Sequence, residues 1–314
     1  MSKLAFVFPG QGSQAVGMGK EFVDTDEGCK KFMQQADEAL GFQLSKLILE
    51  GPQDELTLTY NAQPALLTVG AMIAAKLEQA GITPDYTAGH SLGEYTALVE
   101  SGVISFEDAV VAVHKRGVFM NEAVPAGKGT MAAILGMDRD VLESITRNIT
   151  ESGDPVQPAN LNCPGQIVIS GAKAGVDKAC TALKEAGAKR AIPLDVSGPF
   201  HSVLMQPAAE ELQKTLAGIE MKDAEIPVIA NVTADLVTGQ QDIRNLLVEQ
   251  LYSPVRWEES VEKLLELGVT RFIECGPGKV LSGLIRKIDR KAHVYPVYDE
   301  ESLQKVLEEA KGWS

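Results

Sequence analysis

Residues 89–93 read Gly-His-Ser-Leu-Gly and place Ser91 at the centre of a G-x-S-x-G pattern. A short apolar segment precedes the pattern and helix-forming residues follow it, which is the setting of a serine nucleophile on a sharp strand-to-helix turn. Backbone N–H groups at the start of the helix can stabilise a developing oxyanion. We therefore expect Ser91 to form an acyl-enzyme, with a plain structural turn as the alternative. The pattern leaves open whether the acyl group then passes to water or to another acceptor.

A nucleophilic serine requires a general base, and the chain holds four histidines: His90, His114, His201 and His293. His90 adjoins the nucleophile, and adjacent side chains diverge on a sharp turn. We expect His114 to be solvated on the polar side of its helix. His201 lies between a strand end and a helix start, where the helix N-terminus disfavours imidazolium and keeps the base neutral. We favour His201 over His293, which falls in a C-terminal strand.

No acidic residue is clearly placed to orient the imidazole ring of His201. Asp195 is the closest in sequence, but it belongs to a predicted strand, 189–196, and could point to either side of it. A neutral acceptor, such as a backbone carbonyl group, could hold the imidazole tautomer instead.

An arginine lies on the apolar face of the helix that is predicted to begin near Phe106. On a helical wheel Arg116 is opposite the charged residues and among Ala109, Ala112, Val113, Phe119 and Met120. Burying an unpaired charge is costly, so the guanidinium group requires a carboxylate partner. That partner is either part of an internal salt bridge or arrives with the substrate, bound through two parallel hydrogen bonds.

The elements that must position these residues alternate between strand and helix. Predicted strands at 4–8 and 85–88, with helices at 61–81 and from Phe106, indicate a mainly parallel sheet covered by helices. A loop rich in Gly and Pro follows at 124–130. After it the order is strand, helix, strand, strand, helix, strand, which is typical of a ferredoxin-like unit. These elements are predicted at 130–135, 138–149, 156–160, 166–170, 173–186 and 189–196.

The predicted fold class is therefore α/β with two domains. Residues 1–124 and 198–314 form the large domain, and residues 125–197 form a small ferredoxin-like subdomain inserted into it. The large fold resumes with helices and strands predicted at 203–217, 226–230, 242–251, 256–267, 271–274, 279–288 and 293–297.

The composition excludes several classes of function. The chain has 314 residues, with 45% hydrophobic and 23% charged residues, and it has no signal-peptide layout. No run of 18 apolar residues marks a membrane helix, so we expect a cytoplasmic protein. The formal net charge of −14 argues against nonspecific nucleic-acid binding. Four scattered cysteines without metal or redox spacing are expected to be reduced thiols: Cys29, Cys163, Cys180 and Cys275.

Taken together, these segments resemble the bacterial-type malonyl-CoA:acyl carrier protein transacylases of fatty acid synthesis. The resemblance spans nearly the whole chain and implies an α/β-hydrolase-like core with a ferredoxin-like subdomain. The segments that carry it are FVFPGQGSQ (6–14), QPALLTVG (63–70), GHSLGEYTALV (89–99), HKRGVFM (114–120), GPFHS (198–202), VEQLYSPVRW (248–257) and ECGPGKVL (274–281).

The resemblance also implies a role for each site residue. Ser91 would be the acylated nucleophile and His201 its general base, oriented by the backbone carbonyl group of Gln250. The backbone N–H groups of Gln11 and Leu92 would form the oxyanion hole.

The substrate contacts follow from the same resemblance. Arg116 would bind the malonyl carboxylate, beside an apolar wall of Val113, Phe119 and Met120. Phe200 would crowd out an α-methyl branch and so favour malonyl over methylmalonyl groups.

The reaction that the resemblance implies is a ping-pong transfer. Malonyl-CoA acylates the serine, and the phosphopantetheine thiol of acyl carrier protein then takes the malonyl group. No metal or cofactor is expected, because histidine supplies acid–base catalysis and the backbone stabilises charge. Carrier proteins are acidic, so docking on this acidic chain implies a local basic surface, for which Lys189, Arg190, Arg286 and Lys287 are candidates. A serine hydrolase and a non-catalytic acyl-binding module are the rival classes.

Overall fold

A mainly parallel sheet of six strands forms the centre of the molecule. The computed structural model describes residues 2–313. The strands of this sheet are β1 (Lys3–Phe8), β2 (Tyr86–Gly89), β7 (Val228–Ile229), β8 (Leu236–Val237), β9 (Val269–Cys275) and β10 (His293–Val297). Their order is β10-β9-β1-β2-β7-β8, and only β8 is antiparallel to its neighbour. The central strand β1 is almost wholly apolar and buried, as expected of a parallel strand covered on both faces.

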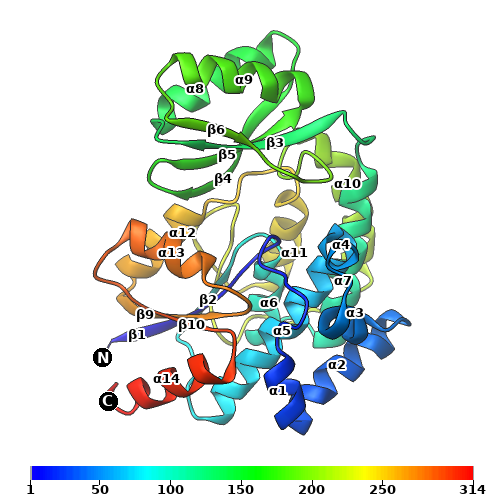
Figure 1. Cartoon of the computed structure of the whole chain (residues 1–314), viewed down its shortest axis with the longest axis vertical. Helices are drawn as coiled ribbons and strands as arrows, with labels where there is room; N and C mark the ends of the chain where they lie inside the picture. Colours follow the sequence, from blue (N-terminus) through cyan, green and yellow to red (C-terminus); the bar gives the residue numbers. More distant parts are fainter. Residues whose placement is uncertain (1, 314) are drawn as a thin grey trace.

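Helices surround the large sheet, some packed against its strands and others packed against further helices (Figure 1). They are α1 (Lys20–Thr25), α2 (Glu27–Leu40), α3 (Leu44–Glu50), α4 (Gln53–Thr57), α5 (Thr59–Gln79), α6 (Gly93–Glu100), α7 (Phe106–Glu122), α10 (Gln206–Ala217), α11 (Gln240–Glu249), α12 (Trp257–Glu266), α13 (Val280–Ile288) and α14 (Glu300–Ala310), with a short 3-10 turn, η1 (Val203–Met205). The long helix α5 is buried along most of its length and packs against α7. No helix in the described part of the chain combines the length and apolar character needed to cross a membrane.

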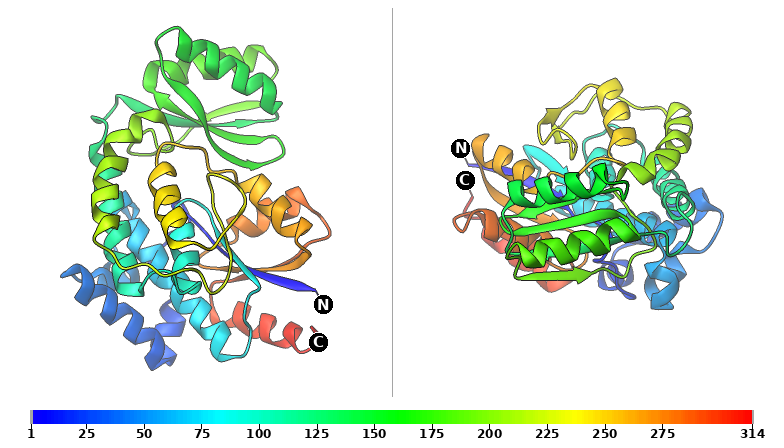
Figure 2. Two further views of the ribbon diagram at one scale, coloured as in Figure 1. Left: turned by 180° about the vertical axis from the view of Figure 1, so that it is seen from behind. Right: turned by 90° about the horizontal axis from the view of Figure 1, so that it is seen from above.

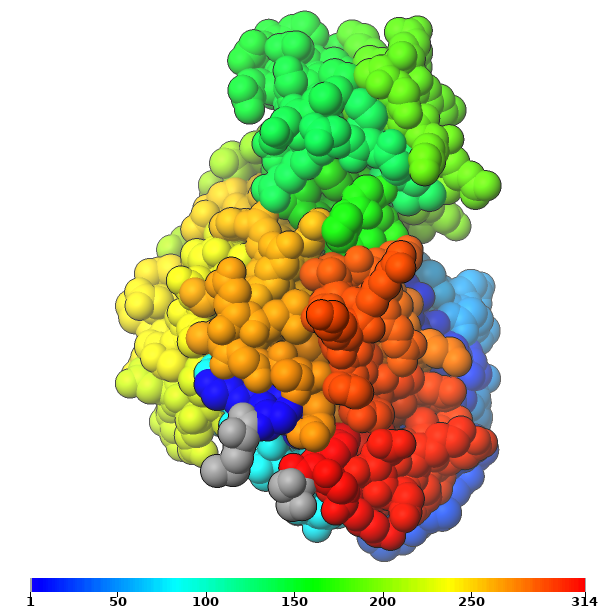
Figure 3. Space-filling view, turned by 90° about the vertical axis from the view of Figure 1, so that its left-hand side faces the viewer, coloured from blue at the N-terminus to red at the C-terminus, as the bar shows by residue number. Residues whose placement is uncertain are grey.

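A separate antiparallel sheet forms the upper lobe in Figures 1 and 3. Its elements are β3 (Gly129–Leu135), α8 (Arg139–Glu151), β4 (Val156–Cys163), β5 (Gln166–Ala172), α9 (Lys173–Glu185) and β6 (Arg190–Pro193). The strand order is β4-β5-β3-β6. Helices α8 and α9 cover the face that points away from the large sheet, as the view from above shows (Figure 2). The prediction of an α/β chain with a mainly parallel sheet is confirmed, and the second sheet is antiparallel.

Backbone hydrogen bonds join the small lobe to the large lobe at strand β4. The amide of Leu161 in β4 donates to the carbonyl oxygen of Val255 at 2.9 Å, and the Val255 amide donates to Ala159 at 2.8 Å. These bonds lie just before α12 and hold β4 against the large lobe. The wall that the small lobe contributes to the space between them is therefore fixed by main-chain contacts.

One predicted strand is shorter than expected. Strand β6 ends at Pro193 instead of continuing to residue 196. Its pairing with β3 stops there, although the Leu194 amide still donates to the Met131 carbonyl group at 3.0 Å. Asp195 consequently lies in a loop, where its side chain is exposed.

Candidate active site

The G-x-S-x-G segment forms the predicted sharp turn between β2 and α6. Ser91 has a φ of 51°, in the left-handed region that non-glycine residues rarely adopt. A Cβ atom at Gly89 would lie 1.9 Å from the backbone of Gly93. A Cβ atom at Gly93 would lie 2.0 Å from the carbonyl oxygen of Phe8. Both glycines are therefore required by close backbone contacts, and the turn holds Ser91 at the start of helix α6.

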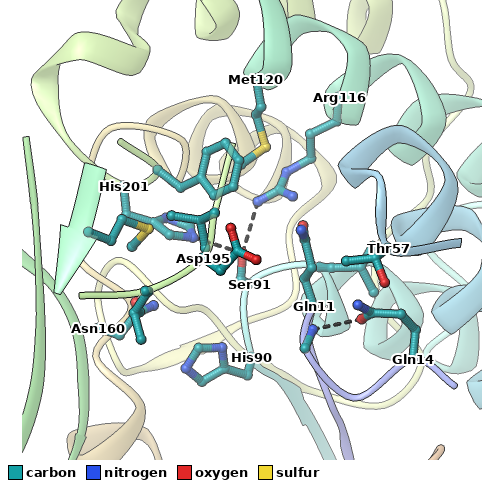
Figure 4. Close-up of a pocket in the computed structure, with 16 residues that line it drawn as sticks. Gln11, Gln14, Thr57, His90, Ser91, Arg116, Met120, Asn160, Asp195 and His201 are labelled. Atoms are coloured by element: carbon teal, nitrogen blue, oxygen red, sulfur yellow. Dashed lines mark hydrogen bonds between the residues drawn. The ribbon is translucent and has the colours of Figure 1, made fainter. Parts of the chain in front are cut away.

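His201 lies directly against the serine hydroxyl group (Figure 4). The distance from Ser91 Oγ to His201 Nε2 is 2.8 Å. On the other side of the ring, Nδ1 lies 2.8 Å from the carbonyl oxygen of Gln250. A carbonyl oxygen can only accept, so Nδ1 carries the proton and Nε2 is free to accept one from Ser91. The arrangement provides a serine with an adjacent neutral base.

The surroundings of His201 keep its ring uncharged. The side chain is 3% exposed, and burial, assisted by the positive charge of Arg116, lowers its pKa to about 3. The residue is itself held in the left-handed region, with a φ of 57°. A ring with this pKa is unprotonated near neutral pH, as a general base must be.

Arg116 on α7 is buried and points at the same hydroxyl group (Figure 4). Its Nη2 atom donates to Ser91 Oγ at 3.1 Å and to the side-chain oxygen of Gln250 at 2.8 Å, and Nη1 donates to Gln63 Oε1 at 2.6 Å. Its Nε atom is buried without an acceptor among the described residues. All three acceptors are neutral, so within residues 2–313 Arg116 forms no salt bridge with a carboxylate. The guanidinium group retains donor capacity for an anion.

A network of hydrogen bonds fixes the backbone of Ser91. Its amide donates to Asn231 Oδ1 at 2.8 Å, and its carbonyl oxygen accepts from Gln250 Nε2 at 3.0 Å. Asn231 also donates from Nδ2 to the Gly89 carbonyl group at 2.7 Å. Beneath them, Glu94 Oε2 accepts from the Asn231 amide at 3.0 Å and from Gln250 Nε2 at 2.8 Å. The unfavourable backbone conformation of Ser91 is thus supported from both sides of the residue.

Several of these supporting residues were missed in the sequence. Glu94 directly follows the G-x-S-x-G segment, and its position on the buried, mainly apolar side of the following helix was a signal for a buried carboxyl group. Gln63 and Asn231 carry no local signal, because both reach the site only through tertiary contacts.

Two backbone N–H groups beside the nucleophile are available to a ligand. The amides of Gln11 and Leu92 have no acceptor in residues 2–313, and both residues line the same cavity as Ser91. Leu92 lies at the first turn of α6, where the helix dipole favours negative charge. The Gln11 side chain is held by a bond from Nε2 to Thr59 Oγ1 at 3.0 Å.

The cavity has a volume of about 250 Å³ and lies between the two lobes. Ser91, His201 and Arg116 line it together with Gln11 and Leu92. Its apolar lining comes from Met120, Met131, Leu194, Val196 and Phe200.

One sequence prediction about this space needs correction. Val113 is buried in the core and Phe119 packs against that core, so of the predicted wall only Met120 reaches the cavity. Asp195 lines the cavity, but the acceptor for the His201 ring is Gln250 and not this carboxylate. The sequence had left both possibilities open.

The other three histidines are held elsewhere. His90 turns away from Ser91, and its Nε2 atom lies 2.8 Å from Asn162 Oδ1 (Figure 4). His114 is not solvated as predicted, because it is half-buried with Nδ1 2.7 Å from the Tyr60 carbonyl oxygen. His293 is exposed at the start of edge strand β10.

The four candidate docking residues are exposed but do not line the cavity. Lys189 and Arg190 lie at the start of β6 in the small lobe, whereas Arg286 and Lys287 lie in the last turn of α13. Arg286 Nη2 also donates to the Val294 carbonyl group at 2.9 Å, so part of its donor capacity is used internally.

Comparison with known proteins places the chain among acyltransferases. A family model described as an acyl transferase domain matches residues 5–304. The malonyl CoA-acyl carrier protein transacylase of Bacillus subtilis (strain 168) is 59% identical over 311 residues, which are 99% of this chain and 98% of that protein.

Solved structures give the same result. An acyl carrier protein S-malonyltransferase from Vibrio cholerae is 47% identical, with a TM-score of 0.95 over 97% of this chain and 100% of its own. A complex described as a type II PKS acyl-carrier protein with its malonyl-transacylase is 43% identical, with a TM-score of 0.95 over 98% of this chain and 100% of its own. With a family match over residues 5–304 and a relative 59% identical along almost its full length, the chain belongs to the acyl transferase family, among the malonyl CoA-acyl carrier protein transacylases.

Proposed function

We propose that this protein transfers the malonyl group of malonyl-CoA to the phosphopantetheine thiol of acyl carrier protein through a malonyl-Ser91 intermediate, in fatty acid biosynthesis. One observation carries the proposal. The hydroxyl group of Ser91 contacts both the base, His201 Nε2, and a buried cation, Arg116 Nη2. The first contact activates the nucleophile, and the second is suited to an acyl group that ends in a carboxylate.

In the first half-reaction Ser91 Oγ attacks the thioester carbonyl carbon of malonyl-CoA. His201 Nε2 takes the hydroxyl proton, and its Nδ1–H group stays bonded to the Gln250 carbonyl oxygen. The amides of Gln11 and Leu92 stabilise the oxyanion. The proton on Nε2 then passes to the sulfur atom as CoA leaves, and malonyl-Ser91 remains.

Arg116 selects the acyl group. A carboxylate separated from the reacting carbonyl group by a single methylene can take over the Nη2 hydrogen bond that Ser91 Oγ now accepts, and Nε is a further donor without an acceptor among the described residues. Phe200 and Met120 line the remaining space, and the aromatic ring of Phe200 disfavours an α-methyl branch.

The second half-reaction reverses the first with a different thiol. The phosphopantetheine thiol gives its proton to His201 and attacks the malonyl ester, and Ser91 regains its proton as the ester is cleaved. The name of the 43% identical complex, in which a malonyl-transacylase binds an acyl-carrier protein, supports this acceptor. We assign docking to the basic pairs Lys189–Arg190 or Arg286–Lys287, and the enzyme acts in the cytoplasm. The chemistry requires no cofactor or metal, because His201 and the backbone amides supply proton transfer and charge stabilisation.

The same proposal includes the architecture inferred from the sequence. Residues 1–124 and 198–314 form an α/β-hydrolase-like domain, and residues 125–197 form a ferredoxin-like subdomain. The chain order β3-α8-β4-β5-α9-β6 and the position of Ser91 between a parallel strand and a helix support this division.

Incubation with radiolabelled malonyl-CoA alone separates the proposal from its rivals. A transferase gives protein that stays labelled, a hydrolase gives labelled free malonate, and a non-catalytic module gives neither. Ser91→Ala is the matched control, because it removes a single hydroxyl group, and it is expected to fold normally and to take no label. Label retained on the Ser91→Ala protein would exclude malonyl-Ser91 as the intermediate.

A further inference from the structure

A second buried charge lies beneath the cavity, and the chemistry derived above does not use it. Glu94 in the first turn of α6 is 2% exposed, and Arg116 is 1% exposed. The side-chain amide of Gln250 connects the two groups. Its oxygen accepts from Arg116 Nη2 at 2.8 Å, and its nitrogen donates to Glu94 Oε2 at 2.8 Å. The carboxylate and the guanidinium group are thus joined through one polar side chain without an ion pair.

Burial, two hydrogen bonds and the charge of Arg116 together set the ionisation of Glu94. Burial raises the pKa of this carboxyl group to about 7, and the hydrogen bonds from Asn231 and Gln250 and the charge of Arg116 oppose that rise. The charged or titratable groups around it are Arg116, from α7, and Tyr95 on its own helix. His201 lies beyond Gln250 and is neutral. Near neutral pH the carboxyl group is therefore close to the midpoint of its titration.

We propose that Glu94 is the resident counter-charge of Arg116 and takes up a proton when the malonyl carboxylate binds. This inference rests on the proposed function, because it requires that Arg116 hold the malonyl group. Above the midpoint of the Glu94 titration, one cation and one carboxylate balance each other in this buried region of the free protein. A second carboxylate would leave two anions sharing one guanidinium group, and in such a site one of them is protonated.

The geometry decides which carboxylate receives the proton. In the proposed complex the malonyl carboxylate bonds to Arg116 directly, whereas Glu94 reaches Arg116 through Gln250. Glu94 Oε2 accepts both of the residue's hydrogen bonds, and Oε1 accepts none from the described residues. A proton on Oε1 therefore leaves the support of Asn231 and Gln250 intact.

The proton balance of acylation makes this event measurable. The hydroxyl proton of Ser91 passes through His201 to the sulfur atom of CoA, so formation of the ester neither consumes nor releases a proton. Any ionisation of the released thiol is the same for malonyl-CoA and acetyl-CoA. A proton taken from solvent specifically with malonyl-CoA therefore binds to a group that responds to the malonyl carboxylate, and the inference assigns it to Glu94.

The experiment follows proton uptake with a pH indicator in weak buffer while the wild-type protein is acylated once by malonyl-CoA. Near pH 7.5 we expect uptake approaching about one proton per labelled serine, and near pH 6 we expect little, because linkage requires Glu94 to be ionised beforehand. Acetyl-CoA should give no uptake per label at either pH. For the same reason the KM for malonyl-CoA should rise above about pH 7, by up to ~10-fold per pH unit.

Two variants locate the proton. Glu94→Gln keeps the shape and an oxygen acceptor, so it should be labelled by malonyl-CoA without uptake and with a KM that is independent of pH. Glu100→Gln is the matched control: this partly buried carboxyl group lies at the end of the same helix, its pKa is raised to about 8 by burial, and it has no hydrogen bond to the site. It should show wild-type uptake.

The outcomes separate this inference from the proposed function. Labelling of wild-type Ser91 without proton uptake overturns the role of Glu94 and leaves the transfer reaction standing. No labelling at all contradicts the transfer reaction itself. Uptake that persists in Glu94→Gln assigns the proton to another group and also overturns the inference. If Glu94→Gln does not fold, the comparison of malonyl-CoA with acetyl-CoA on the wild-type protein still decides, since equal uptake with both rejects it.

Discussion

The backbone carbonyl oxygen of Gln250 accepts a hydrogen bond from His201 Nδ1, while the side-chain oxygen of Gln250 accepts one from Arg116. One residue therefore orients the base through its main chain and the cation through its side chain. Substitution of the side chain should separate these two effects, because the carbonyl group remains in any variant.

Gln250→Leu should reduce acylation by malonyl-CoA more than acylation by acetyl-CoA. The variant leaves Arg116 without one of its acceptors and leaves the Ser91 carbonyl oxygen and Glu94 Oε2 without the Gln250 donor, and each such unpaired buried group costs roughly 1–3 kcal/mol. The base keeps its carbonyl partner, so the acetyl reaction should suffer less. Single-turnover rates with both thioesters test this, and an equal loss for both would show that the side chain does not act through Arg116.

His201→Ala should slow acylation by roughly 100- to 10,000-fold, the usual contribution of a general base. His293→Ala is the control, because that histidine is exposed on an edge strand and should be nearly silent. The assay is burst release of CoA thiol. Loss of the burst in the His293 variant, with a normal burst in the His201 variant, would reverse the assignment of the base.

Arg116→Ala should move the preference of the protein from malonyl-CoA toward acetyl-CoA. Truncating one partner of a buried charge pair costs roughly 2–4 kcal/mol, or about 30- to 700-fold in the malonyl reaction. Acetyl-CoA carries no carboxylate and should lose little.

Arg244→Ala is a matched control for this arginine, since Arg244 is half-buried on α11 and, within residues 2–313, donates only to the Ile219 carbonyl group. Substitution of a purely structural arginine lowers the melting temperature of the protein without changing its preference for malonyl or acetyl groups. The claim that Arg116 reads the substrate fails if its variant keeps the wild-type ratio of malonyl to acetyl rates.

The buried neutral state of His201 should make stability depend on pH. Its pKa is about 3 in the folded protein and near 6.5 when unfolded. Between these values the unfolded chain binds a proton that the folded chain does not. Through this group, the free energy of unfolding is therefore highest above pH ~6.5 and decreases as pH falls toward ~3. The effect is on the order of several kcal/mol. Between pH 4 and 8 the melting temperature should change less with pH for His201→Ala than for the wild type. The same dependence of melting temperature on pH in both proteins would contradict the assignment.

Charge reversal at a docking pair should affect only the second half-reaction. Lys189→Glu with Arg190→Glu, or Arg286→Glu with Lys287→Glu, should raise the KM for acyl carrier protein and weaken its dependence on salt. Acylation by malonyl-CoA should be unchanged, because none of these residues lines the cavity. Equal damage to both half-reactions would mean that the substitutions disturb the fold.

The parts of the site that could be predicted are those with a local steric or periodic cause. The glycines around Ser91 are demanded by backbone contacts within the turn and with β1. Arg116 was recognised from helical periodicity alone, and it is buried where the helical wheel placed it. Both inferences needed only the neighbouring residues.

The parts that could not be predicted depend on contacts between distant segments. Asn231 follows β7 and reaches Ser91 across 140 positions of sequence. His114 was wrongly expected in solvent because its acceptor, the Tyr60 carbonyl group, belongs to the neighbouring helix α5. Helix α2 was left unassigned, although its buried residues Cys29, Met33 and Ala36 recur at helical spacing.

The left-handed backbone conformations of Ser91 and His201 reduce the stability of the folded chain. Each such conformation at a non-glycine residue costs on the order of 1–3 kcal/mol, so the serine and histidine of the proposed reaction lower the stability of the fold. A chain optimised for folding alone would place glycine at both positions and would lose its chemistry. The hydrogen bonds around Ser91 thus offset part of this cost, so the fold keeps two unfavourable backbone conformations that the proposed reaction requires.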